Sequence, residues 1–240
     1  LLFVEAPYGR FVRKGWGVTV NSRRGWLLME LPAALSIAAM ALSGDHGDGP
    51  ALLFLLLWEA HYIYRSLVYP FLIREPGART MPLAVMAMAV LYNCANGFVN
   101  GYHLFWSPAA YGWDWISDWR FIAGVLLFLA GMAAHIWSDR TLQRLRRQAN
   151  GQDRAASDGR TREYRIPRGG LFEYVSAPNY LGEMVQWTGF ALATWSLAGL
   201  SFAVFTVANL LPRALATHRW YRRTFPDYPD SRHAVIPGIL

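Results

Sequence analysis

The sequence predicts an all-α, polytopic membrane protein with seven transmembrane helices, on three observations. First, hydrophobic residues make up 54% of the 240 residues and charged residues only 16%, whereas a soluble domain usually carries about 25% charge. Second, apolar runs close to the roughly 20 residues needed to cross a bilayer recur along the chain. Third, the connections between these runs alternate between arginine-rich and devoid of lysine and arginine. We therefore expect one integral membrane domain over residues 1–240 rather than a soluble helical protein.

The expected transmembrane helices follow one another with short connections and one long one. The chain opens with LLFVEAP, which we interpret as the end of a first spanning helix that is truncated at its N-terminus. Six further apolar stretches follow, and the long polar stretch 138–170 separates the fifth expected helix from the last two. The six stretches cover about residues 25–43, 51–72, 81–105, 120–137, 179–197 and 200–216. Together with the truncated helix they make seven.

The charge of the connections predicts the orientation in the membrane. The segments 8–24, 73–80 and 138–170 and the C-terminal tail are basic, while 44–50 and 106–119 contain no lysine or arginine. By the positive-inside rule, the arginine-rich loops and the C-terminus face the cytoplasm and the N-terminus faces outward. The net charge of +7 then needs no nucleic acid as a partner, because orientation and contact with anionic lipid headgroups explain it.

The stretch 164–187 has the pattern of an anion-binding helix start. Basic residues and two glycines precede Pro178, and Asn179, Glu183 and Gln186 follow at positions that share one helical face. Proline suits the first turn of a helix, where free N–H groups and the helix dipole favour an anion. Guanidinium groups bind phosphates in a bidentate manner, although each arginine could instead serve only orientation. The clustered arginines are Arg144, Arg146, Arg147, Arg165 and Arg168. We expect a phosphate-bearing cofactor at the mouth of this helix.

Two polar residues inside expected spans are candidates for chemistry, because such groups are costly in hydrocarbon. Glu30 lies two residues before Pro32, which leaves the carbonyl of Leu28 without its helical partner and is expected to kink the span. Glu30 is either a neutral, buried carboxyl that donates a hydrogen bond or a partner of freed backbone groups or of an arginine. Tyr62 falls near the middle of its span, which is unusual for an interfacial tyrosine.

Other buried polar residues have two interpretations each. Asn93, Asn96 and Asn100 share one helical face and either join helices or line a cofactor cavity. His135 is either a packed interface residue or a ligand, and Glu59 receives no chemical role. No set of residues has metal-ligand spacing, and neither a dinucleotide-binding glycine motif nor a P-loop is present. We therefore expect no bound metal.

A set of eight stretches is far more specific than any single motif. The stretches are APYGR, the ELP at Glu30, HYIYRSLVYP, NGFVNGYHL, WSDRTLQRLR, YRIPRGGLFEYVSAPNYLGE, TGFALATWSL and RTFPDYPDSRHAVIPGIL. Nearly end to end, the chain resembles the steroid 5α-reductase family, the 3-oxo-5α-steroid 4-dehydrogenases. The resemblance implies a seven-spanning oxidoreductase of steroid and lipid metabolism, of bacterial type, that reduces the Δ4 double bond of 3-oxo-steroids with NADPH. It would lie in the plasma membrane of a bacterium or the endoplasmic reticulum of a eukaryote.

The resemblance also implies roles for individual residues. It places the catalytic glutamate on Glu30 and the catalytic tyrosine on Tyr62, both at the 3-oxo group of the steroid. There they would polarise the enone and stabilise the developing enolate while hydride adds to C5. Contacts with NADPH are implied at Tyr8, Tyr69, Arg74, Asp139, Arg146, Tyr164, Arg165, Asn179, Glu183, Trp187, Arg213 and Tyr221.

Departures from the family pattern and two other interpretations accompany this resemblance. Some family members have histidine where Thr217 stands and asparagine where His135 stands, and the loop 150–160 is longer and more polar than we expect. A membrane methyltransferase of isoprenylcysteine type would use S-adenosylmethionine and has a helix start similar to 178–180, but it leaves Glu30 unexplained. A non-catalytic sterol- or lipid-binding membrane protein would use the buried polar groups only to shape a pocket.

Overall fold

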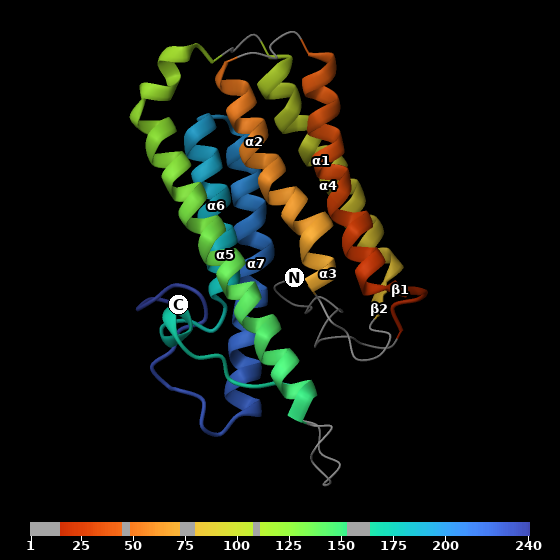
Figure 1. Cartoon of the computed structure of the whole chain (residues 1–240), viewed down its shortest axis with the longest axis vertical. Helices are drawn as coiled ribbons and strands as arrows, with labels where there is room; N and C mark the ends of the chain where they lie inside the picture. Colours follow the sequence, from red (N-terminus) through yellow and green to blue (C-terminus); the bar gives the residue numbers. More distant parts are fainter. Residues whose placement is uncertain (1–14, 45–48, 73–79, 108–110, 153–163) are drawn as a thin grey trace. The chain divides into compact units, whose positions relative to one another are not determined.

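The computed structural model describes residues 15–44, 49–72, 80–107, 111–152 and 164–240, which form six long helical segments and one small sheet (Figure 1). The all-α class is confirmed. Contacts within the chain define two compact units. The N-terminal unit comprises the described parts of 6–128 together with 187–204, and the C-terminal unit comprises the described parts of 129–186 together with 205–240. That the chain is a single domain stays a prediction.

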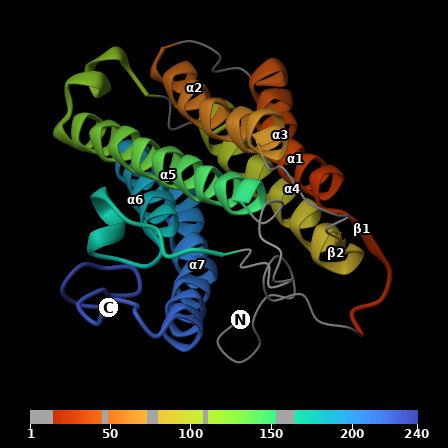
Figure 2. The same cartoon turned by 60° about the horizontal axis from the view of Figure 1, so that its bottom comes forward.

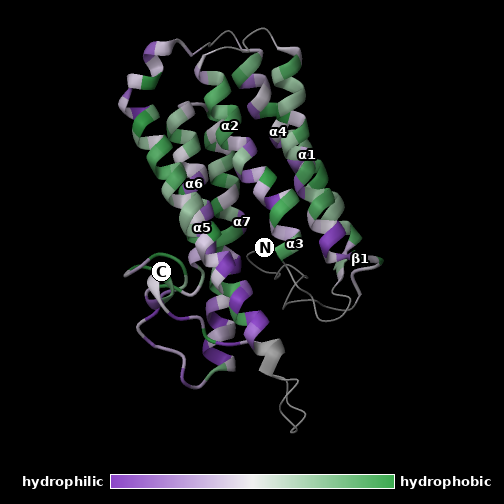
Figure 3. Ribbon diagram, viewed as in Figure 1, coloured by the Kyte–Doolittle hydropathy of each residue, from purple (hydrophilic) through white to green (hydrophobic). Residues whose placement is uncertain are grey.

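Five helices in the described part of the chain are long and apolar enough to cross a membrane: Ser22–Ser43, Pro50–Leu72, Leu83–Phe105, Trp119–Gln148 and Leu197–Thr224. A sixth helix, α6 (Pro178–Thr194), has 17 residues. The first expected helix falls outside the described residues, so the number seven is not shown. Figure 3 shows hydrophobic residues along most of the helical length, with hydrophilic residues at the C-terminal ends of α5 and α7. A polytopic membrane protein is the class that this pattern defines.

The N-terminal unit contains α1 (Ser22–Ser43), α2 (Pro50–Ile63), the π turn η2 (Tyr64–Val68), α3 (Tyr69–Leu72), α4 (Leu83–Phe105) and a sheet of β1 (Thr19–Asn21) with β2 (Thr80–Pro82). α1 and α4 lie side by side in both views (Figures 1 and 2). Gly97 explains how closely they pack, because a Cβ on it would lie 2.8 Å from the carbonyl oxygen of Ala33. Only a glycine allows this approach of the two backbones.

Side-chain hydrogen bonds hold the N-terminal end and the proline turn of α1. The side chain of Asn21 caps the helix by accepting from the backbone N–H of Arg24 at 3.3 Å. Pro32 lies inside α1, and Ser36 donates its hydroxyl to the Pro32 carbonyl at 2.6 Å. One residue beyond the proline, the carbonyl of Ala33 accepts from the indole of Trp58 on α2 at 3.1 Å. The turn around Pro32 is thereby tied to α2.

The expected boundaries of four helices need correction. α5 (Trp119–Gln152) continues through residues 138–152, which we expected in a polar loop. Arginine, leucine and glutamine are good helix formers, so the change in polarity does not end the helix. α6 ends at Thr194, and α7 (Leu197–Thr224) continues into the first basic residues of the expected tail. Likewise, α4 begins at Leu83 because the preceding residues pair in β2.

In the C-terminal unit, the C-terminal tail packs on the loop before α6. The backbone of Val175 pairs with His233 in an isolated bridge, and the N–H of Ser176 donates to the His233 carbonyl at 2.9 Å. The guanidinium of Arg232 donates to the carbonyl of Pro167 at 2.8 Å and pairs with Glu173 at 3.4 Å. The tail therefore fixes the loop that leads into α6.

Candidate active site

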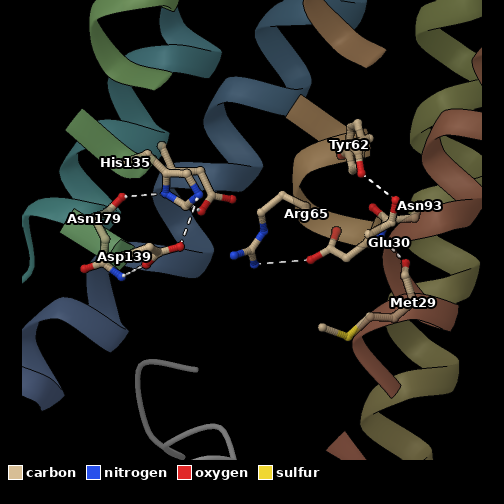
Figure 4. Close-up of polar contacts among 10 residues, drawn as sticks. Met29, Glu30, Tyr62, Arg65, Asn93, His135, Asp139 and Asn179 are labelled. Carbon is tan, nitrogen blue, oxygen red and sulfur yellow. Dashed lines mark hydrogen bonds and ion pairs between the residues drawn. The ribbon is translucent and has the colours of Figure 1, made fainter. Parts of the chain in front are cut away.

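Glu30, the first predicted catalytic residue, forms an ion pair in the N-terminal unit (Figure 4). Its Oε1 lies 3.3 Å from Nη2 of Arg65, and the two side chains are 13% and 9% exposed. The guanidinium of Arg65 also lies over the rings of Trp26 and Tyr69, at 4.5 and 4.7 Å from their centroids. This contact is the arginine pairing that the sequence left open. In an ion pair the carboxylate accepts hydrogen bonds, so Glu30 can donate to a ketone only after it takes up a proton.

Tyr62, the second predicted catalytic residue, lies on α2 two residues before the π turn η2. It is 3% exposed, and its ring packs on Trp58 and Trp187 with centroid distances of 5.0 and 5.8 Å. Figure 4 shows its hydroxyl directed toward Asn93 and Glu30. π turns are frequent at functional sites. The structure therefore brings both predicted catalytic side chains together in a buried environment.

The three asparagines of α4 behave differently from one another. Asn93 donates its amide N–H to the main-chain carbonyl of Met29 on α1. Asn100 instead donates to the carbonyl and to the side-chain oxygen of Asn96 within α4, both at 3.0 Å. All three are buried. Of the two interpretations, joining helices is confirmed for Asn93.

Histidine 135 is the centre of a polar cluster in the C-terminal unit. Its Nδ1 lies 3.2 Å from the main-chain oxygen of Asn179 and 3.6 Å from a carboxylate oxygen of Glu183. Its Nε2 lies 3.6 Å from Asp139, which in turn accepts from the Asn179 amide at 3.3 Å (Figure 4). Three of the predicted cofactor contacts, Asp139, Asn179 and Glu183, thus meet at one point.

Sequence reasoning left the role of His135 open. The spacing of His135 and Asp139, one helical turn apart on α5, is visible in the sequence. The burial of His135, which is 1% exposed, is not. That both side chains face α6 depends on the packing of the two helices. A Cβ on Gly182 of α6 would lie 2.5 Å from the backbone nitrogen of His135, so this close packing is possible only because residue 182 is glycine.

Aromatic contacts connect further predicted cofactor residues of the C-terminal unit. The guanidinium of Arg146 lies over the ring of Tyr164 at 6.0 Å. Tyr164 packs on Trp220 at 5.2 Å, and Trp220 packs on Tyr221 at 5.0 Å. Arg165 is exposed and Arg213 is half-buried in the same unit. Tyr69 and Trp187 belong to the N-terminal unit, whereas Tyr8 and Arg74 lie outside the described residues.

The glycine break before α6 is a tight turn that a carboxylate holds. Gly169 and Gly170 have φ angles of 88° and 52°, which residues with a side chain rarely adopt. The carboxylate of Glu173 accepts from the Gly169 N–H, and this hydrogen bond, followed by the charge of Arg232, lowers the pKa of Glu173 below its ordinary value of 4.5. The turn is therefore fixed at neutral pH with an ionised Glu173.

Metal chemistry finds no ready ligand set in the described part of the chain. There, no group of three or more His, Cys, Asp or Glu side chains has an arrangement that could hold a metal ion. The absence of a metal stays a prediction for the whole protein.

Comparison with known proteins identifies the family. A family model described as 3-oxo-5-alpha-steroid 4-dehydrogenase matches residues 79–240. The chain is 42% identical over 245 residues to 3-oxo-5-alpha-steroid 4-dehydrogenase 1 of Bos taurus, covering 100% of this chain and 90% of the relative. It is 39% identical over 248 residues to steroid 5-alpha-reductase DET2 of Arabidopsis thaliana, with 100% and 89% covered. The chain belongs to the 3-oxo-5-alpha-steroid 4-dehydrogenase family, that is, the steroid 5α-reductases.

The organisms of these relatives do not support the expectation of a bacterial-type member. A further relative, 3-oxo-5-alpha-steroid 4-dehydrogenase 1 of Homo sapiens, is 38% identical over 240 residues, with 98% of this chain and 87% of the relative covered. These relatives come from animals and a plant, so they give the bacterial type no support. The family assignment favours a reductase over the methyltransferase and over non-catalytic sterol binding.

Proposed function

We propose that this protein is an NADPH-dependent 3-oxo-5α-steroid 4-dehydrogenase that reduces the Δ4 double bond of 3-oxo-Δ4-steroids to give 5α-3-oxo-steroids. Similarity to reductases over essentially the whole chain supports this class of oxidoreductase. The observation that carries the proposal is the placement of Glu30 and Tyr62 together in the buried interior of the N-terminal unit. Two buried groups that can donate hydrogen bonds stabilise a ketone oxygen that becomes negatively charged during the reaction.

The proposed chemistry assigns Tyr62 and Glu30 to the 3-oxo oxygen of the steroid. Tyr62 donates its hydroxyl to this oxygen, and Glu30 donates once it carries a proton. Because both side chains are held in place by packing, they stabilise the enolate charge without having to reorganise. When bound, NADPH supplies the hydride that adds to C5. A proton then reaches C4, so the double bond takes up two hydrogens in total.

The side chains of the C-terminal unit suit the parts of NADPH. The guanidinium groups of Arg146, Arg165 and Arg213 match its phosphates. The carboxylates of Asp139 and Glu183 can accept hydrogen bonds from ribose hydroxyls. Tyr164, which packs edge-to-face on Trp220, offers an aromatic surface for its rings. We include Tyr221, which packs edge-to-face on the same tryptophan. We extend the proposal to the remaining predicted contacts, which are Asn179 in this unit and Tyr8, Tyr69, Arg74 and Trp187.

The proposal includes how the protein sits in the membrane. We infer seven spans, with the arginine-rich connections and the C-terminus in the cytoplasm, so that a water-soluble cofactor meets the basic side. The steroid is apolar and would enter from the lipid. Exposed leucines along the helices support a lipid-facing surface, since Leu35, Leu56, Leu91 and Leu126 are each at least 60% exposed.

One assay tests the proposed function. Detergent-purified protein is incubated with NADPH and a panel of 3-oxo-Δ4-steroids, and the products are identified by mass. We expect a gain of two hydrogens for at least one steroid, together with consumption of NADPH. No reduced product with any steroid would contradict the proposal. In a separate measurement, a melting temperature raised by S-adenosylmethionine but not by NADPH would point to a methyltransferase.

A further inference from the structure

Asn93 connects α4 to the residue that precedes the predicted catalytic glutamate. Its amide Nδ2 donates to the main-chain oxygen of Met29, which is followed in α1 by Glu30. Asn93 is 8% exposed and Met29 is also 8% exposed, so this hydrogen bond forms away from water. A buried amide donor that loses its acceptor is left without a hydrogen bond, which costs free energy. The position of the main chain at Glu30 therefore depends on the side chain of Asn93.

The remaining polar atom of Asn93 lies on the side of Tyr62. A carboxamide has donors on its nitrogen and an acceptor on its oxygen. Because the nitrogen donates to Met29, the oxygen is the atom of this amide that can accept from a donor on the other side. Figure 4 shows the Tyr62 hydroxyl directed toward Asn93 and Glu30. One short side chain thus adjoins both predicted catalytic groups.

We propose that Asn93 is a positioning residue for the reduction: it holds the backbone at Glu30 through its nitrogen and orients the Tyr62 hydroxyl through its oxygen. This inference rests on the proposed function, because it acts through those two catalytic groups. Gly97, one turn further along α4, allows the arrangement by letting α4 approach the backbone of α1. Asn93 itself needs no contact with the steroid or the cofactor.

Asn100 provides a matched comparison on the same helix. It is 2% exposed and, like Asn93, an asparagine on the inner face of α4. Its hydrogen bonds go to Asn96 in its own helix, so it serves the local structure of α4. A general need for buried amides in α4 predicts that both asparagines matter equally, whereas a positioning role predicts that only Asn93 affects the rate.

The first test compares Asn93→Leu with Asn100→Leu in purified protein. We expect Asn93→Leu to lower kcat roughly three- to ten-fold, the size of one net hydrogen bond, with the dissociation constant of NADPH unchanged. Asn100→Leu should leave kcat close to wild type. The decisive measurements are two double-mutant cycles, one with Tyr62→Phe and one with Glu30→Gln. If Asn93 acts through these two groups, Asn93→Leu lowers the rate by a smaller factor in each of these backgrounds than in wild type; the same factor in all three backgrounds would overturn the inference.

A second variant covers the case in which Asn93→Leu does not fold. Asn93→Asp preserves the shape, and its carboxyl reproduces the donor and acceptor pattern only when it is protonated. We expect the kcat of Asn93→Asp, relative to wild type at the same pH, to recover as the pH falls. A ratio that is independent of pH would contradict the positioning role.

The outcomes separate this inference from the proposed function. If wild-type protein reduces steroids but Tyr62→Phe is as active as wild type, the proposed catalytic pair is wrong. If Tyr62→Phe and Glu30→Gln are impaired but both cycles with Asn93→Leu are additive, the pair stands and the role of Asn93 is wrong.

Discussion

The partners of the proposed catalytic residues depend on how the helices pack. Glu30 stands out in the sequence because it is a carboxylate in an apolar run, and Tyr62 because it lies deep in a span. The partner of Glu30 could not be predicted, since Arg65 lies on a different helix and reaches Glu30 only when α1 packs near η2. The hydrogen bond from Asn93 to Met29 could not be predicted for the same reason.

At this scale, the first prediction concerns the two proposed catalytic groups. Tyr62→Phe and Glu30→Gln should each lower kcat by about 10²–10³-fold, the effect of losing one group that stabilises a developing oxyanion. Tyr62→Phe removes the donor, whereas Glu30→Gln keeps an N–H donor but replaces the acid by an amide, which cannot share or transfer a proton. Both changes are nearly isosteric, so binding of NADPH should persist, as measured by equilibrium titration. Near-normal turnover in both variants would remove the assignment. Gln at position 30 also ends the ion pair with Arg65, so the melting temperature of each variant serves as the control.

Among the elements, α5 and α6 are held together by glycines, and this leads to the second prediction. A Cβ on Gly182 would lie 2.5 Å from the nitrogen of His135, so Gly182→Ala must push the helices apart at the polar cluster. We expect a lower melting temperature and a several-fold higher dissociation constant for NADPH.

Gly189 on the same helix supplies the control for Gly182. A Cβ there would lie 2.4 Å from the nitrogen of Phe128, which lies about two helical turns before His135 on α5. Gly189→Ala should therefore lower the melting temperature without a comparable loss of cofactor affinity. Equal effects of both substitutions on NADPH binding would argue that the cluster has no special part in it.

The loop before α6 gives the third prediction, which concerns pH. The folded-state pKa of Glu173 is lowered by the Gly169 N–H and by Arg232. A lowered pKa means that Glu173 contributes stability above its unfolded value of about 4.5, and that this contribution is lost as the pH falls through the folded-state pKa. Glu173→Gln should therefore lower the melting temperature at neutral pH, and the difference from wild type should shrink in acid.

Another acidic residue of the same region tests whether this effect is specific. Asp230 is exposed and pairs with Arg222 at 3.3 Å, but it does not hold the glycine turn. Asp230→Asn should change the melting temperature little at any pH, as expected for a surface pair. A melting profile of Glu173→Gln that runs parallel to wild type at all pH values would contradict the role of Glu173.

The helices were more predictable than their ends. Apolar runs of bilayer length locate the beginnings of five candidate spans within a few residues, because burial in lipid requires this composition. The extension of α5 to Gln152 and the π turn at Tyr64–Val68 were not predicted. Both features depend on the pattern of backbone hydrogen bonds, which continues where hydrophobicity changes. Hydropathy alone does not predict this pattern.

For the molecule as a whole, the fourth prediction is the orientation. The alternation of basic connections predicts that the C-terminus lies in the cytoplasm. An epitope tag attached after Leu240 should be reached by antibody in permeabilised cells but not in intact cells. A tag inserted near Ser117, in a connection without lysine or arginine, should be reached by antibody already in intact cells, if that side of the membrane faces the exterior. The reverse pattern of labelling would overturn the proposed topology.

At the same scale, composition predicted the class of membrane protein, and the set of family-like stretches predicted the reaction. Neither could tell which polar groups meet. The His135 cluster joins residues 44 positions apart in the chain, and the pair of Glu30 with Arg65 joins residues 35 apart. Such contacts depend on helix packing, which a list of spans does not contain.

The length of α5 has one more consequence. Its 34 residues make a rod of about 51 Å at 1.5 Å per residue, whereas the oily layer is about 30 Å thick. If α5 runs across the bilayer, roughly 20 Å of it stands in water and bears the hydrophilic end seen in Figure 3. A multiply charged nucleotide can then bind to the part of α5 in water, while an apolar substrate stays in the lipid. One continuous helix thus contacts both phases.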